Sequence, residues 1–372
     1  MKKELRIAKI TLDGYFNFGN ILQSYALQKF LEQYTNHVVT IWHDAKMPTV
    51  LSWWQWTWKE PIKWILNWNK FRSKFYSGFF GMRMIREARI RMFSVERMNC
   101  LYMPGKIAEI ASEFDYFIVG SDQVWNPNFS ATEDFFLTFA PPEKRISYAA
   151  SISAPSIPEK LRQRFADNIM EMHAVSLREQ EGAELVEQLI GRKPAVHIDP
   201  TMLLSAEHWS ALGRKPYWLK VNSYILTYFL GAKPVVIDRI AKDAGLEIIN
   251  LLDQHSFDIY STGVDEFIWL IEHASLVYTD SFHGTVFSIL FRRPFVVCDR
   301  VGDGVESAMS SRIDTLLEMF HLSSRRARFD NGYRIFDPFH IDYSADINEI
   351  LLYERNRSND YFRRAMNLME DE

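Results

Sequence analysis

Short apolar runs alternate along this chain with segments whose apolar residues recur at helical spacing. The run RIAKITL at 6–12 predicts a buried strand, and the apolar positions of residues 20–34 predict the helix that follows it. Further strands of the first half are predicted at 37–43, 115–119, 145–151 and 173–179. The rhythm resumes after residue 205, with strands predicted at 224–230, 246–250, 275–279 and 294–298 and helices at 234–244, 264–273, 284–291 and 310–319.

This alternation predicts the α/β fold class with two similar halves. Strands that alternate with helices form a parallel sheet covered by helices on both faces. We expect a first domain at 1–204, a second domain at 205–344, and a final helix within 345–372 that packs back toward the first domain. Ligands of open α/β sheets bind outside the carboxyl ends of the strands, so the loops after the strands should face a cleft between the halves.

Composition and charge exclude several classes of protein. The chain has 372 residues and a formal net charge of −4, which disfavours a general nucleic-acid binder. Cys100 and Cys298 are too few for a disulfide scaffold and fit a reducing compartment. The first residues contain no apolar stretch typical of a signal peptide, and no run of about 18 apolar residues occurs in the chain. We therefore expect a cytoplasmic protein without a membrane-spanning helix.

The segment 44–92 interrupts the strand and helix pattern. Seven of the 11 tryptophans lie between Trp42 and Trp68, and nine basic residues face two acidic ones between Trp53 and Arg91. Indole rings and basic side chains together are typical of an element that lies on an anionic membrane surface. An inserted pair of helices that buries its tryptophans against the sheet would have the same composition. The sequence leaves both interpretations open.

Two polar loops of the first half follow predicted strands. Residues 13–20 place Asp13, Asn17 and Asn20 at a helix N-terminus, which can bind an anion or a sugar hydroxyl. The loop Gly120–Asn126 combines hydroxyl, carboxylate and amide groups with an indole, which suits a saccharide. Its candidate residues are Ser121, Asp122, Gln123 and Trp125. Helix capping and ordinary turn formation explain the same residues without a ligand.

Charged residues at other strand ends are candidates for chemistry. Arg178 follows the strand at 173–179, where its planar guanidinium suits a phosphate or a carboxylate. The segment 197–201 reads mainly as an interdomain turn, with Asp199 as a structural acceptor. Ion pairs with the glutamates that follow Arg178 are the alternative to a ligand there.

The segment 278–285 carries the most specific constellation. Asp280, Ser281 and His283 follow the strand at 275–279, and a helix then begins at Gly284 and Thr285. Histidine is the side chain best suited to proton transfer near neutral pH, and the helix N-terminus offers N–H groups to an anion. Arg292, Arg293, Arg300 and Arg312 follow and are further candidates for an anion site. No HExxH, HxxxH or CxxC motif occurs, so we expect no metal site.

These segments, taken in this order, resemble the polysaccharide pyruvyl transferase family. The similar segments cover most of the chain up to about residue 320, while the tryptophan-rich insert lies outside them. They are DGYFNFGNILQSYALQ (13–28), FDYFIVGSDQVWN (114–126), SLREQEG (176–182), HIDPTML (197–203), TDSFHGTVFSILFRRPFVV (279–297) and SSRIDTLL (310–317).

The resemblance implies two Rossmann-like domains facing across a cleft in the GT-B manner, with the acceptor on the first domain and the pyruvyl donor on the second. It implies that phosphoenolpyruvate donates its three-carbon unit to two hydroxyls of one sugar, giving a cyclic ketal and phosphate. By similarity, Arg178 and His283 match family positions that bind or act on phosphoenolpyruvate. Around them, the expected donor-binding residues are Ser281, Gly284, Thr285, Arg300 and Arg312.

The chemistry implied by the resemblance can be written on these residues. A cationic His283 would protonate the methylene of phosphoenolpyruvate, and Asp280 or Asp122 would accept a proton from the sugar hydroxyl. The scheme requires neither a metal ion nor an organic cofactor. The basic insert would suit a lipid-linked acceptor in polysaccharide or capsule assembly, with the protein peripheral at the inner membrane face.

Two other classes of function fit the same architecture. A nucleotide-sugar glycosyltransferase of the GT-B kind would need a ribose-binding carboxylate in the second half, where Glu247 and Asp253 are the candidates. A non-catalytic sugar-binding or membrane-adaptor protein would not need the cluster of Arg178, Asp280 and His283.

Overall fold

The structure of the protein is a computed structural model. It describes residues 4–12, 17–42, 79–102, 107–128, 133–300, 310–328, 332–333, 335–343 and 346–369. Asp13 and the tryptophans from Trp53 to Trp68 lie outside the described residues, and so does the membrane-surface prediction that rests on them.

The N-terminal half contains a parallel sheet in Rossmann-like order. Its strands are β1 (Arg6–Ile10), β2 (His37–Trp42), β3 (Cys100–Tyr102), β4 (Tyr116–Val119) and β5 (Arg145–Ser147), in the order β3-β2-β1-β4-β5. Parallel bridges from β5 and the residues after it lead on to β6 (Ser176–Leu177), which pairs with β7 (Ala195–Val196). The sheet order therefore reverses between β1 and β4, where ligands of such sheets bind.

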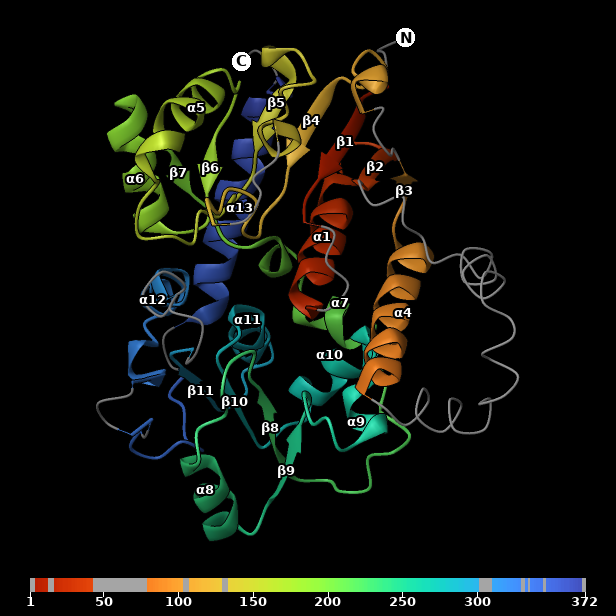
Figure 1. Cartoon of the computed structure of the whole chain (residues 1–372), viewed down its shortest axis with the longest axis vertical. Coiled ribbons are helices and arrows are strands. Elements are labelled where there is room, and N and C mark those ends of the chain that lie inside the picture. The colour runs from red at the N-terminus through yellow and green to blue at the C-terminus, as the bar shows by residue number, and fades with distance from the viewer. Residues whose placement is uncertain are drawn as a thin grey trace, which may run out of the picture.

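The helices of this half cover both faces of the sheet (Figure 1). Their apolar sides join two buried clusters, one of which continues into the C-terminal half. They are α1 (Phe18–Leu31), α4 (Phe79–Arg97), α5 (Glu159–Met170), α6 (Gln180–Ile190) and the short α7 (Ala206–Ser210).

The C-terminal half contains a second parallel sheet with a different order. Its strands are β8 (Tyr224–Tyr228), β9 (Glu247–Asn250), β10 (Leu276–Thr279), β11 (Phe295–Cys298) and β12 (Arg326–Ala327), in the order β12-β11-β10-β8-β9. This is a flavodoxin-like order, which reverses between β8 and β10. Its helices are α8 (Val236–Ala244), α9 (Phe257–Tyr260), α10 (Val264–Glu272), α11 (Phe282–Leu290) and α12 (Ser310–Met319).

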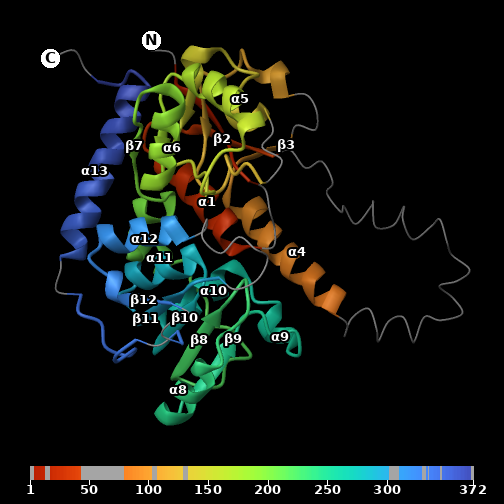
Figure 2. The ribbon, with the colours of Figure 1, turned by 60° about the vertical axis from the view of Figure 1, so that its left-hand side comes forward.

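The last helix, α13 (Ile347–Ala365), returns from the C-terminal half and runs along the N-terminal half (Figures 1 and 2). Tyr361 donates its hydroxyl to the carbonyl of Ser147 at 2.6 Å, and the ring of Phe362 stacks on Tyr148 at 4.6 Å. Arg355 donates to the carbonyls of Met202 and Leu204, at the end of the first domain. These contacts attach the C-terminal end of the chain to the first sheet.

Helix α4 connects the two halves on another side of the molecule. Arg86 is fully buried and donates from Nη1 to the carbonyls of Leu251 and Tyr260, at 3.1 and 3.0 Å. Arg89 donates to the carbonyl of Ser261 and forms an ion pair with Glu266 at 2.8 Å. Two basic residues of the 44–92 segment therefore serve an internal interface. None of the described helices is both long and apolar enough to cross a membrane.

These two sheets confirm the predicted fold class, two Rossmann-like α/β domains in the GT-B manner. The strands at 6–12, 37–43, 224–230 and 275–279 lie where the apolar runs predict them.

Candidate active site

Asp199 is the centre of a buried group of charged side chains where the two halves meet. It caps a short 3-10 turn, and its Oδ1 accepts hydrogen bonds from the backbone N–H and the hydroxyl of Thr201, at 3.0 and 2.7 Å. Its Oδ2 accepts from Ser121 Oγ at 2.9 Å and from Arg178 Nη1 at 2.7 Å. The same oxygen faces Nε2 of His283 at 3.5 Å. One carboxylate thus joins two residues of the N-terminal half to a histidine of the C-terminal half.

Arg178 follows β6, and its side chain reaches Ser121 and Asp122 in the loop after β4. Its side chain is 1% exposed, and Nη1 also donates to Ser121 Oγ at 3.1 Å. Its Nη2 lies 3.8 Å from Oδ1 of Asp122. Within the described residues, neither Nη2 nor Nε has a hydrogen-bond partner. A buried guanidinium with unused N–H groups can bind a small anion through two hydrogen bonds.

His283 lies in the first turn of α11, whose N-cap is Ser281. Its ring packs directly on Gly19, near the start of α1 in the other domain. A Cβ at position 19 would overlap Nδ1 of His283 and would lie 2.7 Å from two other ring atoms. Asn17 caps α1 by accepting a hydrogen bond from the N–H of Gly19 at 2.9 Å. The absence of a side chain at Gly19 therefore allows the histidine to approach Asp199.

The charges in this group hold Asp199 ionised. Burial alone would raise the pKa of Asp199, but the charge of the nearby His283, the charge of Arg178 and the hydrogen bond from Thr201 outweigh it. The net effect holds the pKa of Asp199 well below its usual range. The carboxylate is therefore a fixed negative charge between a guanidinium and an imidazole at neutral pH.

A second buried arginine lies close to the first. Both guanidinium groups contact the ring of Phe282. The guanidinium carbon lies 4.4 Å from the ring centroid in Arg178 and 5.7 Å from it in Arg312. With the Gln123 amide oxygen turned toward Arg312, both terminal nitrogens of the guanidinium donate to it, at 3.0 and 2.9 Å. Burial and the neighbouring Arg178 lower the pKa of Arg312 to about 9. Bringing an anion to this place would relieve the repulsion between the two cations.

Asp280 has partners outside this group and organises its own loop. Its two carboxylate oxygens accept from the N–H groups of Leu230 and Gly231, each at 2.7 Å. Arg300 donates from Nε to Oδ2 at 3.2 Å. These donors fix the loops after β8 and β10 to each other.

The residues that begin α11 use their polar groups within the helix. The hydroxyl of Ser281 accepts from the N–H of Gly284 at 3.3 Å, and Thr285 donates to the carbonyl of Ser281 at 3.1 Å. A Cβ at Gly284 would come within 2.8 Å of Thr279 Oγ1, so the helix begins close against β10. These contacts fix the direction in which His283 leaves the helix.

The expected acceptor residues of the first half have different surroundings. Asn17 accepts a further hydrogen bond from Tyr228 at 3.3 Å, and Asn20 is half-buried on the first turn of α1. Asp122 has a positive φ of 79°, and its Oδ2 has no hydrogen-bond partner among the described residues. Trp125 is fully buried, donates to the carbonyl of Phe135 and stacks on Phe136, so its ring has no face open to a sugar.

The described residues include no group of three histidine, cysteine or acidic side chains that could hold a metal ion. The polar chemistry of the group around Asp199 is that of cations, a carboxylate and an imidazole.

Comparison with known families decides what this arrangement belongs to. The family model for polysaccharide pyruvyl transferase matches residues 17–300, a span that includes Ser121, Arg178, Asp199 and His283. The chain belongs to the polysaccharide pyruvyl transferase family. The resemblance noted in the sequence segments is thereby confirmed. No curated protein matches the chain in sequence.

Solved structures of sugar-nucleotide enzymes are similar to this pyruvyl transferase family member at low sequence identity. The UDP-GlcNAc 2-epimerase of Neisseria meningitidis is 10% identical, with 94% of this chain and 100% of that chain covered at a TM-score of 0.45. Anabaena HepE in complex with UDP and glucose is 10% identical, with 98% and 100% covered at 0.46. The Escherichia coli ADP-heptose LPS heptosyltransferase II is 13% identical, with 94% and 99% covered at 0.36. The orders of the strands in this chain's own two sheets define its fold.

The residue that sequence reasoning undervalued is Asp199. The sequence interpretation made it a structural acceptor in an interdomain turn, whereas its carboxylate contacts both Arg178 and His283. The usable signal is that Asp199 follows β7, the strand next to β6, which places it beside Arg178 at the same sheet edge.

Proposed function

We propose that this protein transfers the pyruvyl unit of phosphoenolpyruvate to two hydroxyls of one saccharide residue, forming a cyclic ketal and releasing phosphate. The observation that carries the proposal is the pair of buried guanidinium groups, of Arg178 and Arg312, beside Phe282. Arg178 also shares the carboxylate of Asp199 with His283. Phosphoenolpyruvate brings a phosphate and a carboxylate, and this group offers cations at close range to each other.

Arg178 and Arg312 bind phosphoenolpyruvate in this proposal. Arg178 has Nη2 and Nε, and Arg312 has Nε, without hydrogen-bond partners within the described residues. Charge-assisted hydrogen bonds to phosphate or carboxylate oxygens would satisfy these buried donors. Arg300 remains on Asp280 and closes the neighbouring loop.

His283 supplies the proton that starts the reaction. Its Nε2 faces Asp199 at 3.5 Å and has no hydrogen bond in the described chain, so this nitrogen is the one that we assign to the substrate. Transfer of its proton to C3 of phosphoenolpyruvate makes C2 electrophilic. Asp199 holds the imidazole in place and stabilises its charged form when the proton is carried.

The remaining steps join the sugar and release phosphate. A first hydroxyl oxygen forms a bond to C2, and its proton passes to Asp122, whose Oδ2 has no hydrogen-bond partner in the described chain. A second hydroxyl of the same sugar then attacks C2, the C2–O bond to phosphate breaks, and its proton leaves with the phosphate. One hydroxyl proton leaves with the phosphate. The other, held by Asp122, replaces through solvent the proton that His283 gave to C3, so both side chains return to their starting states and the protons balance. No metal ion or organic cofactor enters the scheme.

The acceptor binds on the N-terminal side in this proposal. The edge after β1 and β4 carries Asn17, Asn20, Ser121 and Asp122, which offer amide, hydroxyl and carboxylate groups to sugar hydroxyls. The basic, tryptophan-rich composition of residues 44–92 supports an acceptor linked to lipid at a membrane face, as in assembly of a surface polysaccharide.

The test measures phosphate release from phosphoenolpyruvate in the presence of candidate lipid-linked glycans. Mass spectrometry of the glycan should show a gain of pyruvic acid minus water. His283→Ala and Arg178→Met should each lower kcat by about 10³-fold or more, because proton transfer or substrate binding is lost. The matched controls His340→Ala and Arg239→Met change exposed side chains outside the site and should retain activity. Undiminished phosphate release by folded His283→Ala would rule out the proposed proton transfer.

A further inference from the structure

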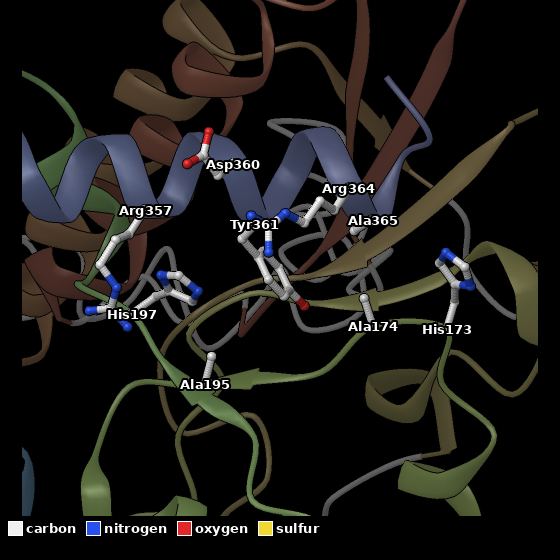
Figure 3. Close-up of a pocket in the computed structure, with 9 residues that line it drawn as sticks. All are labelled: His173, Ala174, Ala195, His197, Arg357, Asp360, Tyr361, Arg364 and Ala365. Atoms are coloured by element: carbon white, nitrogen blue, oxygen red, sulfur yellow. The ribbon is translucent and has the colours of Figure 1, made fainter. Parts of the chain in front are cut away.

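A groove separate from the group around Asp199 lies between α13, the strand β7 and the residues that precede β6. Its volume is about 430 Å³, within the range of cavities that bind small molecules. Figure 3 shows Arg357 and His197 at one end, Tyr361 and Arg364 in the middle, and His173 at the other end. The groove therefore follows the helix along the edge of the first sheet.

The positive charges of the groove come from one face of α13. Arg357 and Arg364 are seven residues apart, which is two helical turns, and they are separated by roughly 10 Å along the axis. Arg357 is engaged by Glu354 through two hydrogen bonds and by the carbonyl of Val196. Within the described residues, the side chain of Arg364 has no ion pair or hydrogen bond, so its guanidinium is open to a ligand.

His197 gives the groove a hydrogen-bond acceptor. Its side chain is buried, and its Nδ1 lies 3.4 Å from Ser358 Oγ. Because the hydroxyl of Ser358 donates to the carbonyl of Glu354 at 2.8 Å, we assign the proton of the neutral His197 ring to Nδ1, on the side of Ser358. Burial and then the charge of Arg357 lower the pKa of His197 to about 4, so the ring is neutral near pH 7. With the proton on Nδ1, Nε2 carries a lone pair that can accept a hydrogen bond from a hydroxyl group.

The remaining lining favours a saccharide over a simple anion. The walls carry the methyl groups of Ala174, Ala195 and Ala365 and the ring of Tyr361, against which the C–H face of a sugar can pack. Asp360 also lines the groove. Its negative charge repels a phosphate ion, but its oxygens can accept hydrogen bonds from hydroxyl groups. An occupant must therefore bring hydroxyls for His197 and Asp360 together with a negative group for Arg364.

We propose that this groove binds an acidic saccharide, with its carboxylate on Arg364 and a hydroxyl donating to Nε2 of His197. The proposal rests on the proposed function, because a pyruvate ketal gives each modified sugar a carboxylate. The groove would then hold an already modified part of the glycan on the same domain that receives the acceptor.

Isothermal titration calorimetry of the full chain, without phosphoenolpyruvate, tests the proposal. The ligands are a methyl galactoside that carries a pyruvate ketal, the same galactoside without the ketal, and inorganic phosphate. The ketal should bind at least about 10-fold more tightly than the neutral sugar, and Arg364→Ala should remove that difference. Arg363→Ala, the neighbouring arginine on α13 that does not line the groove, should leave binding unchanged.

The variants separate this groove from the group around Asp199. Binding of the ketal that survives Arg178→Met and is lost in Arg364→Ala supports the groove. Loss in Arg178→Met with no effect of Arg364→Ala would overturn it, as would phosphate that binds as tightly as the ketal and displaces it. A chain that binds the ketal through Arg364 but transfers no pyruvate would contradict the proposed function and leave the groove supported.

Discussion

The carboxyl edges of the two sheets contribute different things to their meeting point. The N-terminal edge brings charge, because Asp122, Arg178 and Asp199 come from loops after three different strands and the guanidinium of Arg178 contacts both carboxylates. The C-terminal edge brings His283 to the same point, while its own carboxylate, Asp280, is bonded to backbone N–H groups of the neighbouring loop. Asp122 and Asp280, which the sequence offers as equivalent candidates for the base, therefore have different surroundings.

This difference indicates which carboxylates can take part in the reaction and which only stabilise the loops. A carboxylate whose neighbours are a guanidinium and an imidazole can bias the charge and orientation of both. A carboxylate saturated by backbone donors fixes the shape of a loop and has little left to offer a substrate. We therefore assign the chemistry of the C-terminal edge to His283, and the carboxylate chemistry to the N-terminal edge.

The largest effect that follows from the comparison is expected for Asp199→Asn. The amide keeps the shape of the side chain but removes the negative charge that faces Arg178 and His283. We expect kcat for phosphate release to fall by about 10²–10⁴-fold and unfolding to become easier by about 3–5 kcal/mol, because a buried cation loses its counter-charge. Steady-state kinetics and thermal unfolding measure the two effects.

The matched control for that substitution is Asp265→Asn. Asp265 is half-buried and forms an ion pair at 2.8 Å with the exposed Arg214, so its loss should change stability by about 1 kcal/mol or less and leave kcat intact. An Asp199→Asn variant with unchanged kcat would show that the carboxylate is only a structural acceptor.

A smaller effect should distinguish the two edges directly. Asp122→Asn removes the carboxylate that we assign to the acceptor proton and should lower kcat by about 10²-fold with little change in KM for phosphoenolpyruvate. Asp280→Asn leaves a loop N–H facing an amide group and should cost about 1–3 kcal/mol of stability, with kcat within a few-fold of the unchanged protein. The reverse result, a large loss of kcat only in Asp280→Asn, would exchange the roles of the two aspartates.

Much of the fold is predictable because its central strands are buried on both faces. Strand β10 (LVYT) is buried throughout and ends where a polar loop begins, and β1 (RIAKI) is buried from its second residue on although it includes Lys9. The short strands β3, β7 and β12 have two or three residues each, too few to show a periodicity. Helix α4 is not predicted, because its many arginines interrupt the apolar pattern. One of them, Arg86, is buried only because the folded chain brings the carbonyls of Leu251 and Tyr260 to it.

The site is predictable where local sequence determines it and not where tertiary contacts do. Arg178 directly follows a strand, and His283 lies in the first helical turn after one, so their position at a sheet edge follows from the pattern. Asp199 acquires its partners only when the loop after β7 meets the loops after β4 and β6 and the first turn of α11. Trp125 has neighbours typical of a sugar site, but its ring stacks on Phe136, a partner that the local sequence does not indicate.

The smallest expected effect concerns the contact between the two edges at Gly19. A methyl group there would overlap the imidazole of His283, so Gly19→Ala must displace the ring from its place beside Asp199. Displacements of this size lower rates by about 10–100-fold, and the strain should cost about 1–3 kcal/mol. The loss should appear in kcat rather than in KM for phosphoenolpyruvate, because the two arginines keep their places. Gly213→Ala, whose Cβ would come no closer than 3.3 Å to its neighbours, should retain full activity. If Gly19→Ala proves fully active, the position of His283 described here is not the one that the reaction uses.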